Sequence, residues 1–76
     1  MNRQAAAMER AIKDAINKAG GPTALSRKIK ADGEQSATSV AVSQWRKCPP
    51  KRVLYLEKLT EVSRHRLRPD IFGEEN

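Results

Sequence analysis

The sequence predicts an all-α fold, a single bundle of four to five short helices spanning residues 1–76, and three observations lead to this expectation. The chain has 76 residues, enough for one domain but too few for a core that also encloses an active site. Apolar residues recur at helical spacing in several short stretches. Gly and Pro residues separate these stretches, where helices tend to end and begin.

The first helix is expected over residues 5–19, AAAMERAIKDAINKA, and ends at Gly20-Gly21, because glycine tolerates the left-handed conformation that follows a helix. Pro22 suits the first turn of a second helix over residues 22–30, since its missing N–H costs nothing there. Residues 31–35, ADGEQ, predict a loop. The apolar positions expected to face the core are Met8, Ala11, Ile12, Ala15, Ile16 and Ala19 in the first helix and Ala24, Leu25 and Ile29 in the second.

A third helix is expected over residues 39–47, with Thr38 as its N-cap and with Val42 and Trp45 turned toward the core. Pro49-Pro50 ends it. A fourth helix is expected over residues 50–60, with Val53, Leu56 and Leu59 inward. Ser63 is expected to cap a single turn ending near Leu67, and residues 68–72 are expected to be extended and packed through Ile71 and Phe72.

Two short helices joined by a turn, the second capped and followed by cations, are typical of a helix-turn-helix, here at about residues 22–47. The charge distribution favours a polyanionic partner. The chain carries +6 overall, and residues 27–52 alone hold seven Lys and Arg and two acids, a net +5. The alternative explanation is a surface kept soluble by charge.

The exposed side chains expected on helix 39–47 suit DNA. Gln44 has the groups to pair with adenine N6 and N7 in the major groove, and Val40 has a methyl surface for a thymine methyl. Ser39 and Ser43 suit base edges or phosphates. Cations then follow at Arg46, Lys47, Lys51 and Arg52, where phosphates would flank the groove.

Three stretches, GGPTALSRKI, VSQW and PPKRVLYLEKLTEVSRHRLRPDIFG, together resemble the Cro-like helix-turn-helix regulators of prophages, especially the YdaS type. The resemblance covers about residues 8–73. It implies a small lambda-repressor/Cro-like bundle that binds double-stranded operator DNA, usually as a homodimer. By motif position it implies base reading by Ser39, Val40 and Gln44, backbone proximity for Thr38, Ser43 and Lys47, and phosphate contacts by Thr23 and Arg27.

The sequence departs from that family in one place. The connection from Ile29 to Thr38 is about six residues longer than the usual turn, and Lys30 stands where the turn Gly would be. This loop either meets the DNA backbone or extends a helix end and projects sideways, so the docking angle depends on it.

Other residues favour no further chemistry. With one Cys and one His, we expect no metal site, no Cys–His nucleophile and no cofactor or small-molecule substrate, and hence no enzyme. Cys48 is expected to be a small bystander and His65 a surface residue. Trp45 is expected in the core, with base stacking as the lesser alternative. No apolar run is long enough to span a membrane, which predicts a cytoplasmic protein, associated with the bacterial nucleoid.

The leading functional hypothesis is therefore a sequence-specific DNA-binding transcriptional regulator, a phage or prophage repressor. The alternative is an antitoxin or another protein-interaction module, which would more often show an apolar or acidic surface than a basic one. For the homodimer, Leu67, Ile71 and Phe72 are the apolar candidates for pairing, and their other possible role is to cover the monomer's own core.

Overall fold

The chain folds as an all-α bundle, as the sequence predicts. The computed structural model describes residues 3–74, which contain no strand. The helices of this part of the chain are α1 (Arg3–Lys18), α2 (Pro22–Ala31), α3 (Ser39–Ser43), the short 3₁₀ helix η1 (Pro50–Arg52), α4 (Val53–Thr60), α5 (Arg64–Leu67) and α6 (Pro69–Phe72). The six α-helices exceed the expected four to five because residues 69–72 are helical.

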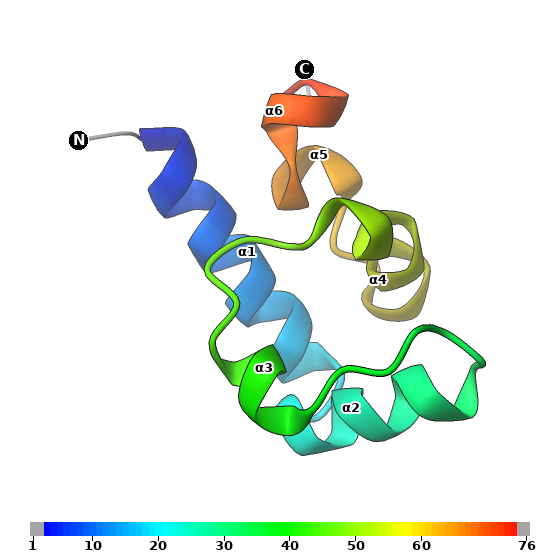
Figure 1. Ribbon diagram of the computed structural model, residues 1–76. Coiled ribbons are helices and arrows are strands. Elements are labelled where there is room, and N and C mark those ends of the chain that lie inside the picture. The colour runs from blue at the N-terminus through cyan, green and yellow to red at the C-terminus, as the bar shows by residue number, and fades with distance from the viewer. Residues whose placement is uncertain (1–2, 75–76) are drawn as a thin grey trace.

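Helix α1 runs along the length of the molecule, with α2 and α3 at one end, and α5 and α6 lie at the other end, beside the start of α1 (Figure 1). Its apolar face is buried as expected. The two glycines after it have φ values of 101° and 103°, which L-residues rarely adopt. The Gly21 N–H donates to the Ile16 carbonyl at 2.9 Å, so the chain turns sharply into α2.

The core joins all parts of the bundle. Leu25 and Ile29 of α2, Val42 of α3 and Leu56 of α4 are all fully buried, as the spacing predicts. Leu59, expected to be buried, only packs partly against this core. The bundle thus has one core, and α3 contributes a single side chain to it.

The expectation of an extended segment at 68–72 is wrong. Arg68 alone is extended, with φ −142° and ψ 70°, and Pro69 then begins α6 at a position where its missing N–H costs nothing. Phe72 is half-buried against the core, whereas Ile71 is 49% exposed and does not pack as expected. Leu67 is fully buried, so it covers the monomer's core and is not free for pairing.

Arg68 connects this C-terminal turn to the chain that follows α3. Its guanidinium is buried and pairs with both oxygens of Asp70, at 2.9 Å from Nε and 2.7 Å from Nη2. Its Nη1 donates to the Cys48 carbonyl at 3.0 Å. These three hydrogen bonds therefore fix α6 relative to the chain that follows α3.

Candidate nucleic-acid interface

Helix α3 is shorter than the expected 39–47 and ends at Ser43. Its start is as predicted, since the Thr38 hydroxyl accepts a hydrogen bond from the Ala41 N–H at 3.1 Å. The stretch holds Ser and β-branched Val, which favour helix weakly, and Pro49 disfavours a helical conformation just before it. Gln44 therefore caps the C-terminal end of α3 and does not lie in mid-helix.

The exposed face of α3 carries the expected base-reading side chains. Val42 is the one buried residue of this helix. Val40 is 63% exposed, Ser39 is half-buried and Gln44 is exposed. The Ser43 hydroxyl donates to the Val40 carbonyl at 2.7 Å, which leaves its oxygen able to accept from a partner.

The first turn of α2 lies beside the end of α3. Pro22 and Ser43 line the same shallow hollow, together with Lys13 and Asn17 of α1, with a volume of about 220 Å³. Thr23, next to Pro22, and Arg27, one turn further along α2, are both exposed. The structure therefore brings the start of α2, at Pro22, close to the end of α3.

Helix α1 also borders this region, which the sequence did not indicate. Glu9 and Lys13 line a second hollow of about 530 Å³ together with Gln44, Trp45 and Arg46. Lys13 pairs with Glu9 at 2.9 Å, and this hydrogen-bonded ion pair lowers the pKa of Glu9. In the sequence Lys13 is one of several polar residues on the outer side of an amphipathic helix, so only the packing of α1 against the end of α3 distinguishes it.

The expected phosphate-binding cations divide into two kinds. Arg46, Lys47 and Lys51 are exposed. Arg52 is half-buried, and its guanidinium lies 5.6 Å from the centre of the Trp45 ring. It also donates to the Ser36 carbonyl, at a long 3.4 Å. Trp45 itself is half-buried and packs against the core.

The long connection between α2 and α3 is folded against the protein. The Ser26 hydroxyl donates to the Ala37 carbonyl, and the Tyr55 hydroxyl donates to Asp32 at 2.7 Å. Burial and the Asp32 hydrogen bond raise the pKa of Tyr55 to about 12. Helix α2 gains one residue over the expectation, to Ala31, and the loop then turns toward α4. The structure thus shows a slightly longer helix and a loop held against α2 and α4.

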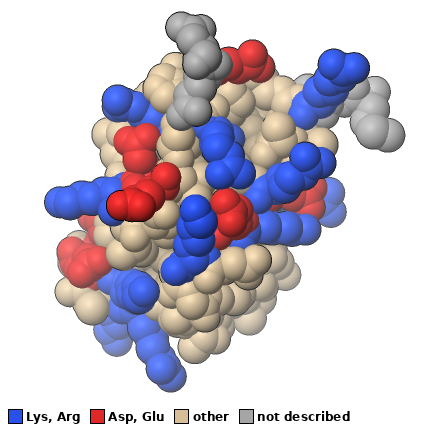
Figure 2. All heavy atoms as spheres, turned by 180° about the vertical axis from the view of Figure 1, so that it is seen from behind, with Lys and Arg blue, Asp and Glu red and all other residues tan. Residues whose placement is uncertain are grey.

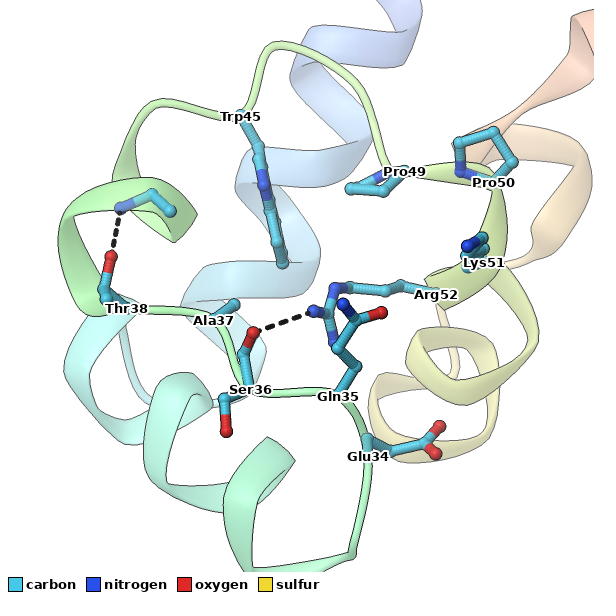
Figure 3. Close-up of a pocket in the computed structure, with 11 residues that line it drawn as sticks. Glu34, Gln35, Ser36, Ala37, Thr38, Trp45, Pro49, Pro50, Lys51 and Arg52 are labelled. Carbon is cyan, nitrogen blue, oxygen red and sulfur yellow. Dashed lines mark hydrogen bonds between the residues drawn. The ribbon is translucent and has the colours of Figure 1, made fainter.

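A groove of about 730 Å³ separates this connection from the segment after α3 (Figure 3). Trp45, Pro49 and Pro50 form one wall, and residues 34–38 form the other. In Figure 3, Arg52 points into the groove between Trp45 and the carbonyl of Ser36.

Charges of both signs are interspersed on the face opposite to the view of Figure 1 (Figure 2). On α1, Asp14 meets Arg66 at 3.2 Å and Lys18 at 4.0 Å, in addition to the Glu9–Lys13 pair. The positive charges on α1 are therefore partly paired with carboxylates.

Within residues 3–74 the structure has no group of three or more His, Cys, Asp and Glu side chains placed to hold a metal ion. Cys48 is fully buried, and this burial raises the pKa of its thiol to about 12. The His65 Nδ1 lies 3.0 Å from the Gly73 carbonyl. None of the helices in the described part of the chain has the length and apolar character needed to cross a membrane.

The sequence model of a family described as "Bacterial toxin YdaS" matches residues 12–76. Because this match covers most of the chain, the chain belongs to that family. No curated protein and no solved structure matches the chain.

Proposed function

We propose that this member of the YdaS family is a sequence-specific regulator that binds double-stranded operator DNA through the major groove, in the bacterial cytoplasm at the nucleoid. It acts as a binding module of the Cro-like helix-turn-helix type and not as an enzyme. The observation that carries the proposal is the outer face of α3. One buried valine anchors this helix, and small, uncharged side chains able to form hydrogen bonds or methyl contacts face outward.

The geometry of α3 suits the entry of its N-terminal residues into a groove about 12 Å wide. Ser39 and Val40 lie in its first turn, and Gln44 lies at its end, so these three reach base edges as the helix enters. A hydrogen-bonding helix of this kind carries no charge of its own, and affinity then depends on flanking cations.

The proposed phosphate contacts come from the chain before and after α3. Thr23 and Arg27 of α2 precede this helix in the sequence, and the exposed cations follow it. Lys13 of α1, beside Gln44, adds a contact that the sequence does not indicate. The proposed phosphate contacts are thus Thr23, Arg27, Thr38, Arg46, Lys47 and Lys51. Ser43 is proposed to lie near the DNA backbone, but its hydroxyl must release the Val40 carbonyl before it can donate to a phosphate.

The experiment is a binding-site selection from random duplex followed by two substitutions. Gln44→Ala is expected to lose about 1–3 kcal/mol on the selected site, to relax preference at one base pair per half-site, and to leave binding to random duplex nearly unchanged. Arg27→Ala is expected to weaken both duplexes alike and to reduce the salt slope by about 1 per half-site. Neither side chain is buried, so the melting midpoint serves as the folding control.

Two outcomes contradict the proposal. If Gln44→Ala loses equal affinity for selected and random duplex, α3 does not read bases. If neither variant changes DNA binding but one abolishes capture of a protein partner, the chain is a protein-interaction module of the antitoxin kind.

The regulator is proposed to bind as a homodimer, because a domain this small covers only one half-site. The selected site should then be an inverted repeat with half-sites about 10 bp apart. Leu67 is buried, so Ile71 has the largest exposed fraction of the three apolar residues considered for pairing. Ile71→Ser should weaken binding to the repeat but not to an isolated half-site, and a selected site without symmetry, bound one-to-one, refutes the dimer.

A further inference from the structure

Helix α3 lies against α2 but has only five residues, and Val42 is the only one that is buried. The contact with α2 and this one buried side chain locate the helix, and the chain at its two ends contributes to fixing its rotation about the helix axis. The chain on either side of α3 therefore helps it to present the same face to every site.

Arg52 contacts the chain on both sides of α3. Its Nη2 donates to the carbonyl of Ser36, two residues before the N-cap Thr38. Its guanidinium lies over the ring of Trp45, two residues after the last helical residue, Ser43. One planar cation thus joins the entry and the exit of α3, across the groove shown in Figure 3.

Arg52 comes from a firmly placed part of the chain. It lies at the end of η1, directly before Val53, which is fully buried. Its backbone N–H donates to the Pro49 carbonyl at 2.9 Å. Tyr55, one helical turn after Arg52, holds the start of the connection between α2 and α3, because its hydroxyl donates to Asp32. Helix α4 and η1 therefore supply fixed points for a connection whose length would otherwise leave it many conformations.

We propose that Arg52 is a positioning residue, which fixes the orientation of α3 by joining Ser36 to Trp45 and so determines DNA selectivity without contacting DNA. This inference rests on the proposed function and differs from the phosphate contact that the sequence predicts for Arg52. Arginine is suited to the role because its planar guanidinium can stack on a ring and donate in-plane hydrogen bonds at once, whereas a lysine ammonium is a point charge.

The test compares three variants. Arg52→Lys keeps the charge and loses the planar fork. Arg52→Gln and Lys51→Gln each remove one charge at adjacent positions, and the Lys51 side chain makes no ion pair or hydrogen bond with residues 3–74. Each protein is titrated with the selected site and with random duplex over a series of salt concentrations. Acrylamide quenching of Trp45 fluorescence is measured on the free proteins, well below their lowest melting midpoint.

The expected results distinguish a positioning role of Arg52 from a phosphate contact made by its charge. Arg52→Lys should keep the wild-type salt slope but lower the ratio of selected to random affinity about tenfold, which is the scale of one base contact. Its Trp45 should become more accessible to acrylamide. Lys51→Gln should reduce the salt slope by about 1 and leave both the ratio and the quenching unchanged. Arg52→Gln should show the same Trp45 quenching and the same affinity ratio as Arg52→Lys, and its salt slope should equal that of the wild type.

Two results overturn the inference. The first is that Arg52→Lys keeps the wild-type ratio of selected to random affinity and the wild-type quenching of Trp45. The second is that Arg52→Gln behaves like Lys51→Gln, with a reduced salt slope and an unchanged affinity ratio. A wild-type protein that prefers no duplex refutes the proposed function and with it the role in selectivity. The quenching of Trp45 in Arg52→Lys then still decides whether Arg52 joins the two ends of α3.

Discussion

Removing the carboxylate of Asp70 should destabilise the whole bundle, because it leaves the buried guanidinium of Arg68 without its counter-charge. Asp70→Asn keeps the shape of the side chain but loses the charge from two hydrogen bonds, of 2.9 and 2.7 Å. The Arg68 side chain is only 7% exposed and that of Asp70 is 32% exposed. Solvent therefore reaches the carboxylate but not the guanidinium.

The magnitude follows from these contacts. Hydrogen bonds to charged groups contribute about 1.5–3 kcal/mol each, and breaking a buried ion pair costs about 3–5 kcal/mol. Asparagine can retain one hydrogen bond, from the guanidinium to its amide oxygen, and the partial exposure of Asp70 screens the charge, so we expect a loss of about 2–3 kcal/mol. For a domain of this size each 1 kcal/mol lowers the melting midpoint by about 4–8 °C, and the expected shift is about 8–24 °C.

The assay is thermal unfolding followed by circular dichroism, with Asp14→Asn as the matched control. Asp14 also pairs with an arginine, Arg66, at 3.2 Å, but the two side chains are 39% and 46% exposed. An exposed pair contributes at most about 1 kcal/mol, so the control should shift the midpoint by a few degrees. Equal shifts in the two variants would refute the reasoning that burial of the arginine makes the Asp70 contact important.

The remaining predictions test other parts of the molecule. The hydrogen bonds from Arg68 lower the pKa of Asp70 below its ordinary 3.8. The carboxylate therefore stabilises the fold fully above pH 3.8, and this stabilisation disappears as pH falls through the lowered pKa. The free energies of unfolding of wild type and Asp70→Asn should thus become equal in an acid titration. Leu56→Ala should cost about 2–5 kcal/mol in a urea titration, since Leu56 is fully buried, and a smaller loss would contradict its place in the core. Cys48 should react with iodoacetamide at pH 8 only as fast as the protein opens, because its thiol is buried with a pKa raised to about 12, and rapid labelling of the native protein would contradict this. Glu61→Gly should stabilise by about 0.5–1 kcal/mol, because Glu61 ends α4 at φ 64°, where glycine has no Cβ strain; a lowered midpoint would count against it.

The sequence by itself determined most of the helices and the core. The apolar spacing of α1, the glycine stop after it, Pro22 at the start of α2 and the Thr38 cap are all local signals, and local signals decide helix existence and starts. The side chains available on α3 are likewise read directly from the chain. That they bind DNA is a proposal, based on their hydrogen-bonding groups and the nearby charge.

Only the tertiary structure decided how α3 ends and what holds it. The weak helix formers and Pro49 favour an early end, but apolar spacing alone still allowed a helix to residue 47, and the packing of Trp45 and Cys48 against the core fixes the chain beyond Ser43. Arg52 contacts Trp45 and Ser36, which lie on the two sides of α3, and Lys13 of α1 lines the same hollow as Gln44. These arrangements join residues that are not neighbours along the chain. A surface cation looks the same in a sequence whether it faces solvent or a ring, because its partner is set by packing and not by its neighbours along the chain.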